Sequence, residues 1–117
     1  MQIFGRNPRS WIYRPLSPEE AGLFRAASES SGLWPVVVHT NYLINLCSPD
    51  AEIFQKSVDI FIKELSIAED IAADYLVTHL GSPRDSGTRF AIERVGQALK
   101  EVAGSGLGLK TMILLEN

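Results

Sequence analysis

The sequence predicts an α/β fold in which parallel strands alternate with helices. Short apolar runs without polar alternation, typical of strands buried on both faces of a parallel sheet, recur at similar intervals along the chain. Between them lie stretches of helical periodicity that open on helix-start signals. We therefore expect the order β-α-β-α-β-α-β, with right-handed crossovers between neighbouring strands.

Four apolar runs are expected to form the strands. They are residues 2–4, 33–38, 75–78 and 112–115. The first helix is predicted to begin after Ser17, since Pro18 suits the first helical position and Glu20 completes a capping box. It is expected to stop at Gly32.

The other two helices are predicted from apolar stripes. The second helix opens at residues 48–50, and its apolar side chains step by three or four residues, so we expect this stripe to lie on the sheet. These side chains are Phe54, Val58, Phe61, Leu65 and Ala68. The third helix begins near Ser86 and ends in glycines. Its apolar face has Ala91, Val95, Leu99 and Val102, and the glycines are Gly104, Gly106 and Gly108.

The composition is that of an ordinary globular protein. Hydrophobic residues make up 45% of the 117 residues and charged residues 21%, which excludes a disordered tail or a coiled coil. No apolar run approaches the roughly 20 residues of a membrane span, and the first residues lack a signal-peptide layout. We therefore expect no membrane partner and a cytoplasmic location. Cys47 is the only cysteine, which excludes an internal disulfide and a multi-cysteine metal cluster.

The formal net charge of −3 argues against attraction of the whole surface to nucleic acid or to anionic membrane. Basic residues nevertheless gather near the start of the chain, where Arg6, Arg9 and Arg14 have no acidic residue among them. Two interpretations fit this distribution. The three side chains form either a local basic patch or a loop of separately solvated arginines.

Length limits how much of a barrel the chain can form. A complete (β/α)8 barrel typically requires about 250 residues. An open flavodoxin-like sheet and a segment of a barrel both fit the 117 residues, in which four strands would make half a barrel. Such a half leaves two strand edges unpaired and one sheet face uncovered, so we expect self-association, aggregation or marginal stability.

Each strand after the first ends in a side chain that can bind a metal ion. His39, His79 and Glu116 each directly follow one of the predicted strand runs. In parallel α/β folds functional groups gather at the carboxyl ends of strands, and neighbouring strand ends lie about 5 Å apart. Two imidazoles and one carboxylate match the ligand set of catalytic zinc, although manganese tolerates the same residues. The alternatives are histidines satisfied within the structure and a glutamate in a frayed chain end.

Three loops beside these strand ends have further polar and aromatic groups. Residues 40–46 include an aromatic ring and two amides, and Gly81 would let backbone N–H groups approach an anion. Residues 5–11 combine guanidinium groups, an amide and an indole, which suits phosphate contacts and base stacking. The alternative is an ordinary loop that Trp11 pins in the core.

Taken together, four stretches resemble endonuclease IV, the family of zinc-dependent apurinic/apyrimidinic DNA-repair nucleases with a TIM-barrel fold. They are residues 7–11, 39–46, 79–82 and 115–117, in the family's order. The resemblance covers nearly the whole chain. It implies that residues 1–117 form a single incomplete segment of a TIM (β/α)8 barrel, with about four parallel strands and three helices. By the same resemblance, the family's first strand would precede Met1 and its later strands would follow Asn117.

The resemblance also implies roles for the residues at the strand ends. His39, His79 and Glu116 match ligands of a cluster that holds three zinc ions in the complete enzyme, so one ligand set is present here. Glu116 would bridge two of the metals and is the expected catalytic residue. In this family zinc-bound hydroxide attacks the phosphate 5′ to an abasic sugar.

By the same resemblance, Asn7, Arg9 and Tyr42 belong to DNA-binding loops. Arg9 and Tyr42 would enter the duplex at the lesion and help hold the abasic nucleotide flipped out. Pro83 departs from the pattern, because many members have a further histidine there. We expect the isolated chain to bind abasic double-stranded DNA weakly or not at all, and to lack robust activity.

Two other functions remain open at this point. One is that of a sugar isomerase or epimerase from the xylose-isomerase-like barrels, which also place histidine and glutamate at strand ends. The other is that of a non-catalytic module that binds one metal ion or self-associates through its open sheet edges.

Overall fold

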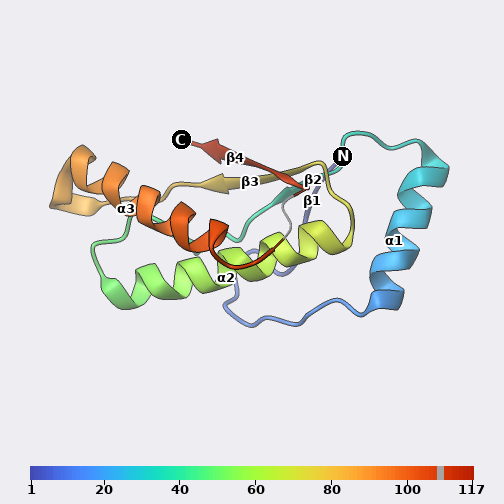
Figure 1. Cartoon of the computed structure of the whole chain (residues 1–117), viewed down its shortest axis with the longest axis horizontal. Helices are drawn as coiled ribbons and strands as arrows, with labels where there is room; N and C mark the ends of the chain where they lie inside the picture. The colour runs from blue at the N-terminus through green and yellow to red at the C-terminus, as the bar shows by residue number, and fades with distance from the viewer. Residues whose placement is uncertain (108–109) are drawn as a thin grey trace.

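The computed structural model describes residues 1–107 and 110–117. Within them, four parallel strands form one sheet in the order of the sequence, as predicted (Figure 1). The strands are β1 (Gln2–Phe4), β2 (Val37–His39), β3 (Tyr75–His79) and β4 (Met112–Glu116). The helices between them are α1 (Pro18–Ser31), α2 (Ala51–Asp70) and α3 (Gly87–Ala103), with a short 3-10 helix, η1 (Arg84–Ser86), before α3.

The helix ends follow their local signals. Ser17 caps α1 by accepting a hydrogen bond from the Glu20 N–H at 3.1 Å, while the Glu20 carboxylate accepts one from the Ser17 N–H at 2.8 Å. Gly32 ends this helix with a φ of 63°, a conformation that glycine adopts readily. Asp50 caps α2 by accepting from the Ile53 N–H at 3.0 Å. Gly108, predicted among the glycines after α3, lies outside the described residues.

The core lies between the sheet and α2. All five predicted stripe residues of α2 are buried, and they pack in one cluster with Val38 of β2 and Leu76 of β3. Val38, Leu76 and Phe61 are fully shielded from solvent. Burial of one large apolar side chain stabilises the fold by about 1.5 to 3 kcal/mol, so this layer is the main source of stability.

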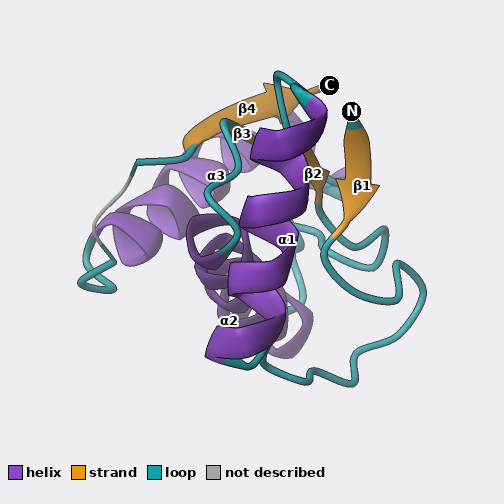
Figure 2. Cartoon of the chain, turned by 90° about the vertical axis from the view of Figure 1, so that its right-hand side faces the viewer, coloured by secondary structure: helices purple, strands orange, loops and turns teal. Residues whose placement is uncertain are grey.

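The helices lie on the same side of the sheet (Figure 2). Helices α2 and α3 run beneath the strands, whereas α1 stands at one end of the molecule (Figure 1), with Ala21 as its buried residue. Alternate residues of each strand therefore face the helices, and the others face the uncovered side. Among the described helices, none is both long and apolar enough to cross a membrane.

Two strand predictions need correction. The strand expected over residues 33–38 begins only at Val37, and Trp34 is 76% exposed. Pro35 has no N–H for a strand ladder, and its carbonyl accepts from the amino group of Met1 instead. The apolar run 112–115 does form a strand, but β4 is not buried on both faces.

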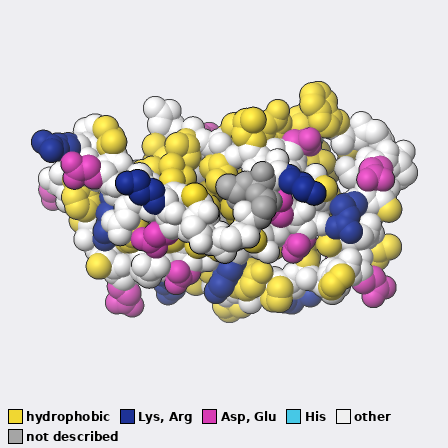
Figure 3. All heavy atoms as spheres, viewed as in Figure 1, with side chains coloured by type: hydrophobic (Ala, Val, Ile, Leu, Met, Phe, Trp, Pro, Cys, Tyr) yellow, Lys and Arg dark blue, Asp and Glu magenta, His cyan; other side chains and the backbone are white. Residues whose placement is uncertain are grey.

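Strand β4 is mostly exposed because, among the described residues, it pairs with β3 alone. Its exposed apolar side chains are Met112, Leu114 and Leu115. Figure 3 shows hydrophobic side chains along the upper edge of the molecule, where Figure 1 draws β4. At the other end of the sheet, β2 is the one strand of the described part of the chain that pairs with β1. Within the described residues the sheet thus has two open edges and one open face, as expected of half a barrel.

Candidate metal centre and adjoining loops

The strand register brings three side chains that can bind a metal ion to one place. His79 and Glu116 are directly paired across β3 and β4, and His39 ends the neighbouring strand β2. The Glu116 Oε2 lies 3.1 Å from the His39 Nε2 and 3.5 Å from the His79 Nδ1. One ligand atom from each residue lies within 4.8 Å of the others. The expected ligands therefore meet at the carboxyl edge of the sheet, and their role as ligands stays a prediction.

The contacts of His39 fit a bound cation. Its Nδ1 lies 2.8 Å from the Thr40 carbonyl, which accepts a hydrogen bond from it and so leaves the lone pair of a neutral ring on Nε2. That lone pair faces the Glu116 carboxylate, which is also an acceptor. A cation between them satisfies both atoms, and a carbonyl behind the ring is the usual support of a metal-binding histidine.

The three candidate ligands differ in how far their side chains are exposed to solvent. The His39 side chain is 7% exposed, whereas those of His79 and Glu116 are 45% and 50% exposed. Beneath the histidines, the buried Thr40 and Thr78 hydroxyls are joined by a hydrogen bond of 3.0 Å. The site therefore has a buried, hydrogen-bonded base and a side open to solvent.

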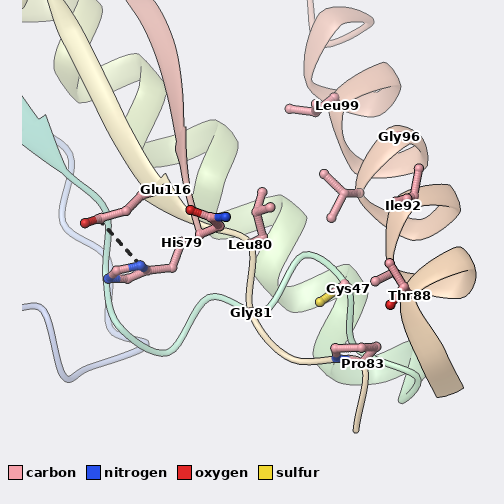
Figure 4. Close-up of a pocket in the computed structure, with 13 residues that line it drawn as sticks. Cys47, His79, Leu80, Gly81, Pro83, Thr88, Ile92, Gly96, Leu99 and Glu116 are labelled. Atoms are coloured by element: carbon pink, nitrogen blue, oxygen red, sulfur yellow. Dashed lines mark ion pairs between the residues drawn. The ribbon is translucent and has the colours of Figure 1, made fainter. Parts of the chain in front are cut away.

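An apolar groove of about 710 Å³ runs from the site along α3. Figure 4 shows His79 and Glu116 at one end of it, with Ile92 and Leu99 of α3 across from them. Cys47 lies in its wall as a buried thiol, and burial raises the pKa of that thiol.

Aromatic rings cover the histidines on their other side. The Tyr42 ring centroid lies 5.7 Å from that of His39 and 6.3 Å from that of His79. Phe4 supports this arrangement, with ring centroids 5.3 Å from Tyr42 and 5.5 Å from His39. Tyr42 itself is 52% exposed, so it is accessible to a ligand.

The structure brings the loop of Asn7 and Arg9 to the loop of Tyr42. The Tyr42 N–H donates to the Pro8 carbonyl at 3.0 Å. The Asn7 Oδ1 accepts from the Arg9 N–H at 3.0 Å, which shapes the loop locally, while the Arg9 residue is exposed. All three predicted DNA-binding residues thus lie in adjoining loops at the carboxyl edge of the sheet. Their contact with DNA stays a prediction.

Arg6, Arg9 and Arg14 do not share one kind of environment, as both interpretations of this segment assumed. The Arg6 side chain is only 6% exposed, and its Nη1 lies 3.6 Å from the Glu64 carboxylate. Arg14 forms an ion pair with Glu20 at 2.8 Å. Neither a common basic patch nor three separately solvated arginines describes this segment.

The position of Trp11 agrees with the alternative prediction, in which this residue anchors the loop of residues 5–11 in the core. Its ring packs against the core, with the Lys56 ammonium 4.8 Å from the ring centroid. The exposed apolar residue of this loop is the next one, Ile12, at 82%.

Gly81 has a structural role in its turn, and its expected role at an anion stays a prediction. Its φ of 91° is one that glycine favours, as the turn requires. The N–H of the following Ser82 donates to the Asn45 Oδ1 at 3.1 Å, however, so this donor is already used. Gly81 instead makes room for the Asn45 side chain.

Sequence reasoning missed Glu64. It is fully buried on α2, and its two carboxylate oxygens lie 3.1 and 3.0 Å from the Asn41 N–H, which donates to them. Burial raises its pKa to about 7, although Asn41 and Arg6 act in the opposite direction. The signal was a glutamate beside Leu65 on the apolar face of α2.

A family model described as a xylose isomerase-like TIM barrel matches residues 1–117. The chain belongs to this family. The family and the four-stranded parallel sheet together confirm the predicted fold class, a partial TIM barrel.

Among the relatives of this TIM-barrel chain are proteins named probable endonuclease 4. The one from Chloroflexus aurantiacus is 44% identical over 116 residues, which cover 99% of this chain and 41% of the relative. The one from Methanoculleus marisnigri is 47% identical over 116 residues, with the same coverage. The chain thus spans about two fifths of the length of these curated relatives.

A solved structure gives the same result. Endonuclease IV from Thermus thermophilus superposes on the chain with a TM-score of 0.80 and 37% identity, over 99% of this chain and 40% of that protein. The resemblance to endonuclease IV that the sequence motifs indicated is therefore confirmed.

Proposed function

We propose that this chain holds part of the active site of a DNA-repair endonuclease of the endonuclease IV type, which cleaves the phosphodiester bond 5′ to an abasic site. The observation that supports this most directly is the position of Tyr42. Its ring lies over His39 and His79, and its backbone is bonded to the loop of Arg9. Candidate metal ligands and candidate DNA contacts therefore share one edge of the sheet. The names of the relatives agree with this function.

The metal in this proposal is zinc. His39, His79 and Glu116 offer two imidazoles and one carboxylate, the set found at catalytic zinc sites. A zinc ion held there would lower the pKa of a bound water and polarise a phosphate oxygen. Glu116 is the proposed catalytic residue, because its carboxylate faces both histidines and is half exposed. Three zinc ions in the complete enzyme, with one ligand set in this chain, complete the proposal.

Abasic duplex DNA is the proposed substrate. The exposed Arg9 suits a phosphate, and the half-exposed Tyr42 ring suits stacking at the gap that a missing base leaves. Asn7 would contact the backbone or hold Arg9 in place. We propose residues 1–117 as one incomplete barrel segment, which alone binds abasic DNA weakly or not at all. The cytoplasmic location expected from the sequence stays a prediction.

A chimera tests the proposed function. This chain would replace the matching segment of endonuclease IV from Thermus thermophilus, whose fold it shares. We expect the chimera to cut a duplex with one abasic analogue on its 5′ side and to leave the undamaged duplex intact. Circular dichroism first establishes that the chimera is folded.

Two matched variants of the chimera complete the design. Glu116→Gln should abolish cutting, whereas Glu93→Gln, an exposed position on α3, should not change it. A folded chimera that leaves abasic DNA intact contradicts the proposal. Turnover of an aldose instead would favour the isomerase alternative.

Self-association is a second candidate property, and the exposed strand β4 favours it. Leu115 is 49% exposed and Met112 60% exposed on a strand that pairs on one side only within the described residues. Exposed apolar edge strands add further strands readily. Light scattering should give the mass of a dimer or larger species, and Leu115→Lys should shift it to the monomer. A monomer at every concentration contradicts this candidate.

A further inference from the structure

The two loops that bear Arg9 and Tyr42 meet above a buried carboxyl group on α2, that of Glu64. We propose that Glu64 is a positioning residue, which acts through Arg6 and Asn41 to fix the positions of these two loops relative to each other. This inference rests on the proposed function, because the relative position of Arg9 and Tyr42 matters only if both contact DNA.

The first link joins α2 to the loop of Tyr42. Glu64 is fully buried, and both of its carboxylate oxygens accept from the backbone N–H of Asn41, the residue before Tyr42. A hydrogen bond from a backbone N–H to a buried carboxylate is among the stronger ones in proteins. The loop after β2 is therefore fixed to a long helix rather than only to another loop.

The second link joins α2 to the loop of Arg9. Arg6 lies 3.6 Å from Glu64, and its Nη2 donates to the Ile12 carbonyl at 2.8 Å and to the Ser10 carbonyl. The buried Nε and Nη1 of Arg6 have no hydrogen-bond partner among the described residues. The Glu64 carboxylate is thus the group that balances the buried guanidinium charge, and Arg6 shapes the loop on both sides of Trp11.

The third link joins the two loops directly. The Asn41 Nδ2 donates to the Ser10 carbonyl at 2.6 Å and to the Asn7 carbonyl at 3.3 Å. Its Oδ1 accepts from the Leu43 N–H at 2.6 Å. Glu64 thus fixes the backbone of Asn41, and the side chain of Asn41 forms hydrogen bonds with both loops.

A purely stabilising role would not require a charge here. Replacing a buried ion pair by apolar side chains of similar size is often neutral or stabilising, because desolvation of the charges is costly. Leu65 and Phe61 show that α2 packs apolar side chains well beside this position. The particular value of Glu64 is geometric, since a carboxylate can fix an N–H and a guanidinium in defined directions.

Amide hydrogen exchange of the chain, followed by NMR without DNA or metal, tests this inference. The reporter is the Tyr42 N–H, which donates to Pro8 only while the loops are docked. Above the pKa of about 7 that burial gives Glu64, Glu64→Gln removes the carboxylate charge beside Arg6 and keeps the size of the side chain. We expect Tyr42 to exchange roughly tenfold faster or more, while the core amide of Leu76 is unchanged.

Glu69→Gln is the matched control. Glu69 is also on α2 and also accepts from backbone N–H groups, those of Lys110 and Thr111, but at the opposite edge of the sheet. This variant should leave the Tyr42 exchange rate unchanged. Equal acceleration in Glu64→Gln and Glu69→Gln would mean a general loss of stability and would overturn the inference.

Arg6→Lys decides the question if Glu64→Gln does not fold. Lysine keeps the positive charge beside Glu64 but cannot reach the Ser10 and Ile12 carbonyls with a planar fork. We expect the same acceleration at Tyr42, and an unchanged rate overturns the inference. Because neither DNA nor metal is present, this result is independent of whether the proposed endonuclease activity is found.

Discussion

The side chain of Asn45 fills the space that a Cβ atom on Gly81 would need. The Asn45 Cγ lies 2.6 Å from that position and the Asn45 Cα lies 2.8 Å from it. The same side chain accepts from the Ser82 N–H at 3.1 Å and donates to the Ser82 carbonyl at 3.0 Å. The loop after β2 is thereby joined to the loop that follows His79, which fixes two of the three candidate metal ligands relative to each other.

Gly81→Ala should therefore destabilise the fold. Its φ of 91° costs on the order of 1 to 3 kcal/mol for a residue with a side chain. The new Cβ would also displace Asn45 and break its hydrogen bonds with Ser82. We expect the free energy of unfolding, measured by urea titration, to fall by more than about 2 kcal/mol.

Gly32→Ala is the control for this experiment. Gly32 also has a positive φ, 63°, but no atom lies within 4 Å of the position of its Cβ. In Gly32→Ala the free energy of unfolding should fall only by the cost of the left-handed backbone conformation, about 1 kcal/mol. Equal losses at the two glycines would show that the contact of Asn45 with Gly81 contributes nothing.

The position of the core predicts unequal effects of two phenylalanines. Phe61 is fully buried between α2 and the sheet, so Phe61→Ala should reduce the free energy of unfolding by about 3 to 5 kcal/mol. Phe4 lies on the open face and is 36% exposed, so Phe4→Ala should cost about 1 to 2 kcal/mol. Urea titration measures both. Similar losses of unfolding free energy in the two variants would contradict the position of the main core on the face of the sheet that the helices cover.

The helices could be predicted because their signals are local. The capping box of Ser17 and Glu20 and the left-handed Gly32 act within one turn of the helix. The strands were harder, because an apolar run has the same appearance whether or not a neighbouring strand covers it. Burial of β4 depends on a partner beyond β3, which no residue of 112–115 encodes.

The candidate ligands were found because register in a parallel sheet follows from order in the sequence. His79 and Glu116 pair directly because both end their strands. Glu64 was missed because its partners, Arg6 and Asn41, are distant along the chain. The environment of a buried ionisable group depends on such contacts between distant residues, which cannot be predicted from periodicity or composition.

Stability should fall as pH rises through the titration of Glu64. Burial raises the pKa of this carboxyl from 4.5 to about 7, with Arg6 and His39 as the charged or titratable groups that oppose the shift. Between these two values the folded chain retains a proton that the unfolded chain has released. Ionising Glu64 therefore costs more free energy in the folded chain than in the unfolded chain, and the free energy of unfolding falls as pH rises from 4.5 to about 7.

Urea titrations across this pH range measure the effect. Glu64→Gln cannot titrate at this position, so its free energy of unfolding should fall less with pH than that of the unchanged chain. Identical pH dependence in the two proteins would show that Glu64 does not titrate in the folded state.

Metal binding should depend on the three residues at the carboxyl edge of the sheet. A zinc titration against a competing chromophoric chelator should give one tight site per chain, because one ligand set is present. His39→Ala and Glu116→Gln should each weaken binding by at least about tenfold, since each removes one ligand of three. Glu93→Gln, which changes an exposed carboxylate that pairs with Arg89, should leave binding unchanged. Unaltered zinc affinity in Glu116→Gln would exclude this carboxylate as a ligand, and equal losses in all three variants would point to nonspecific binding at the surface.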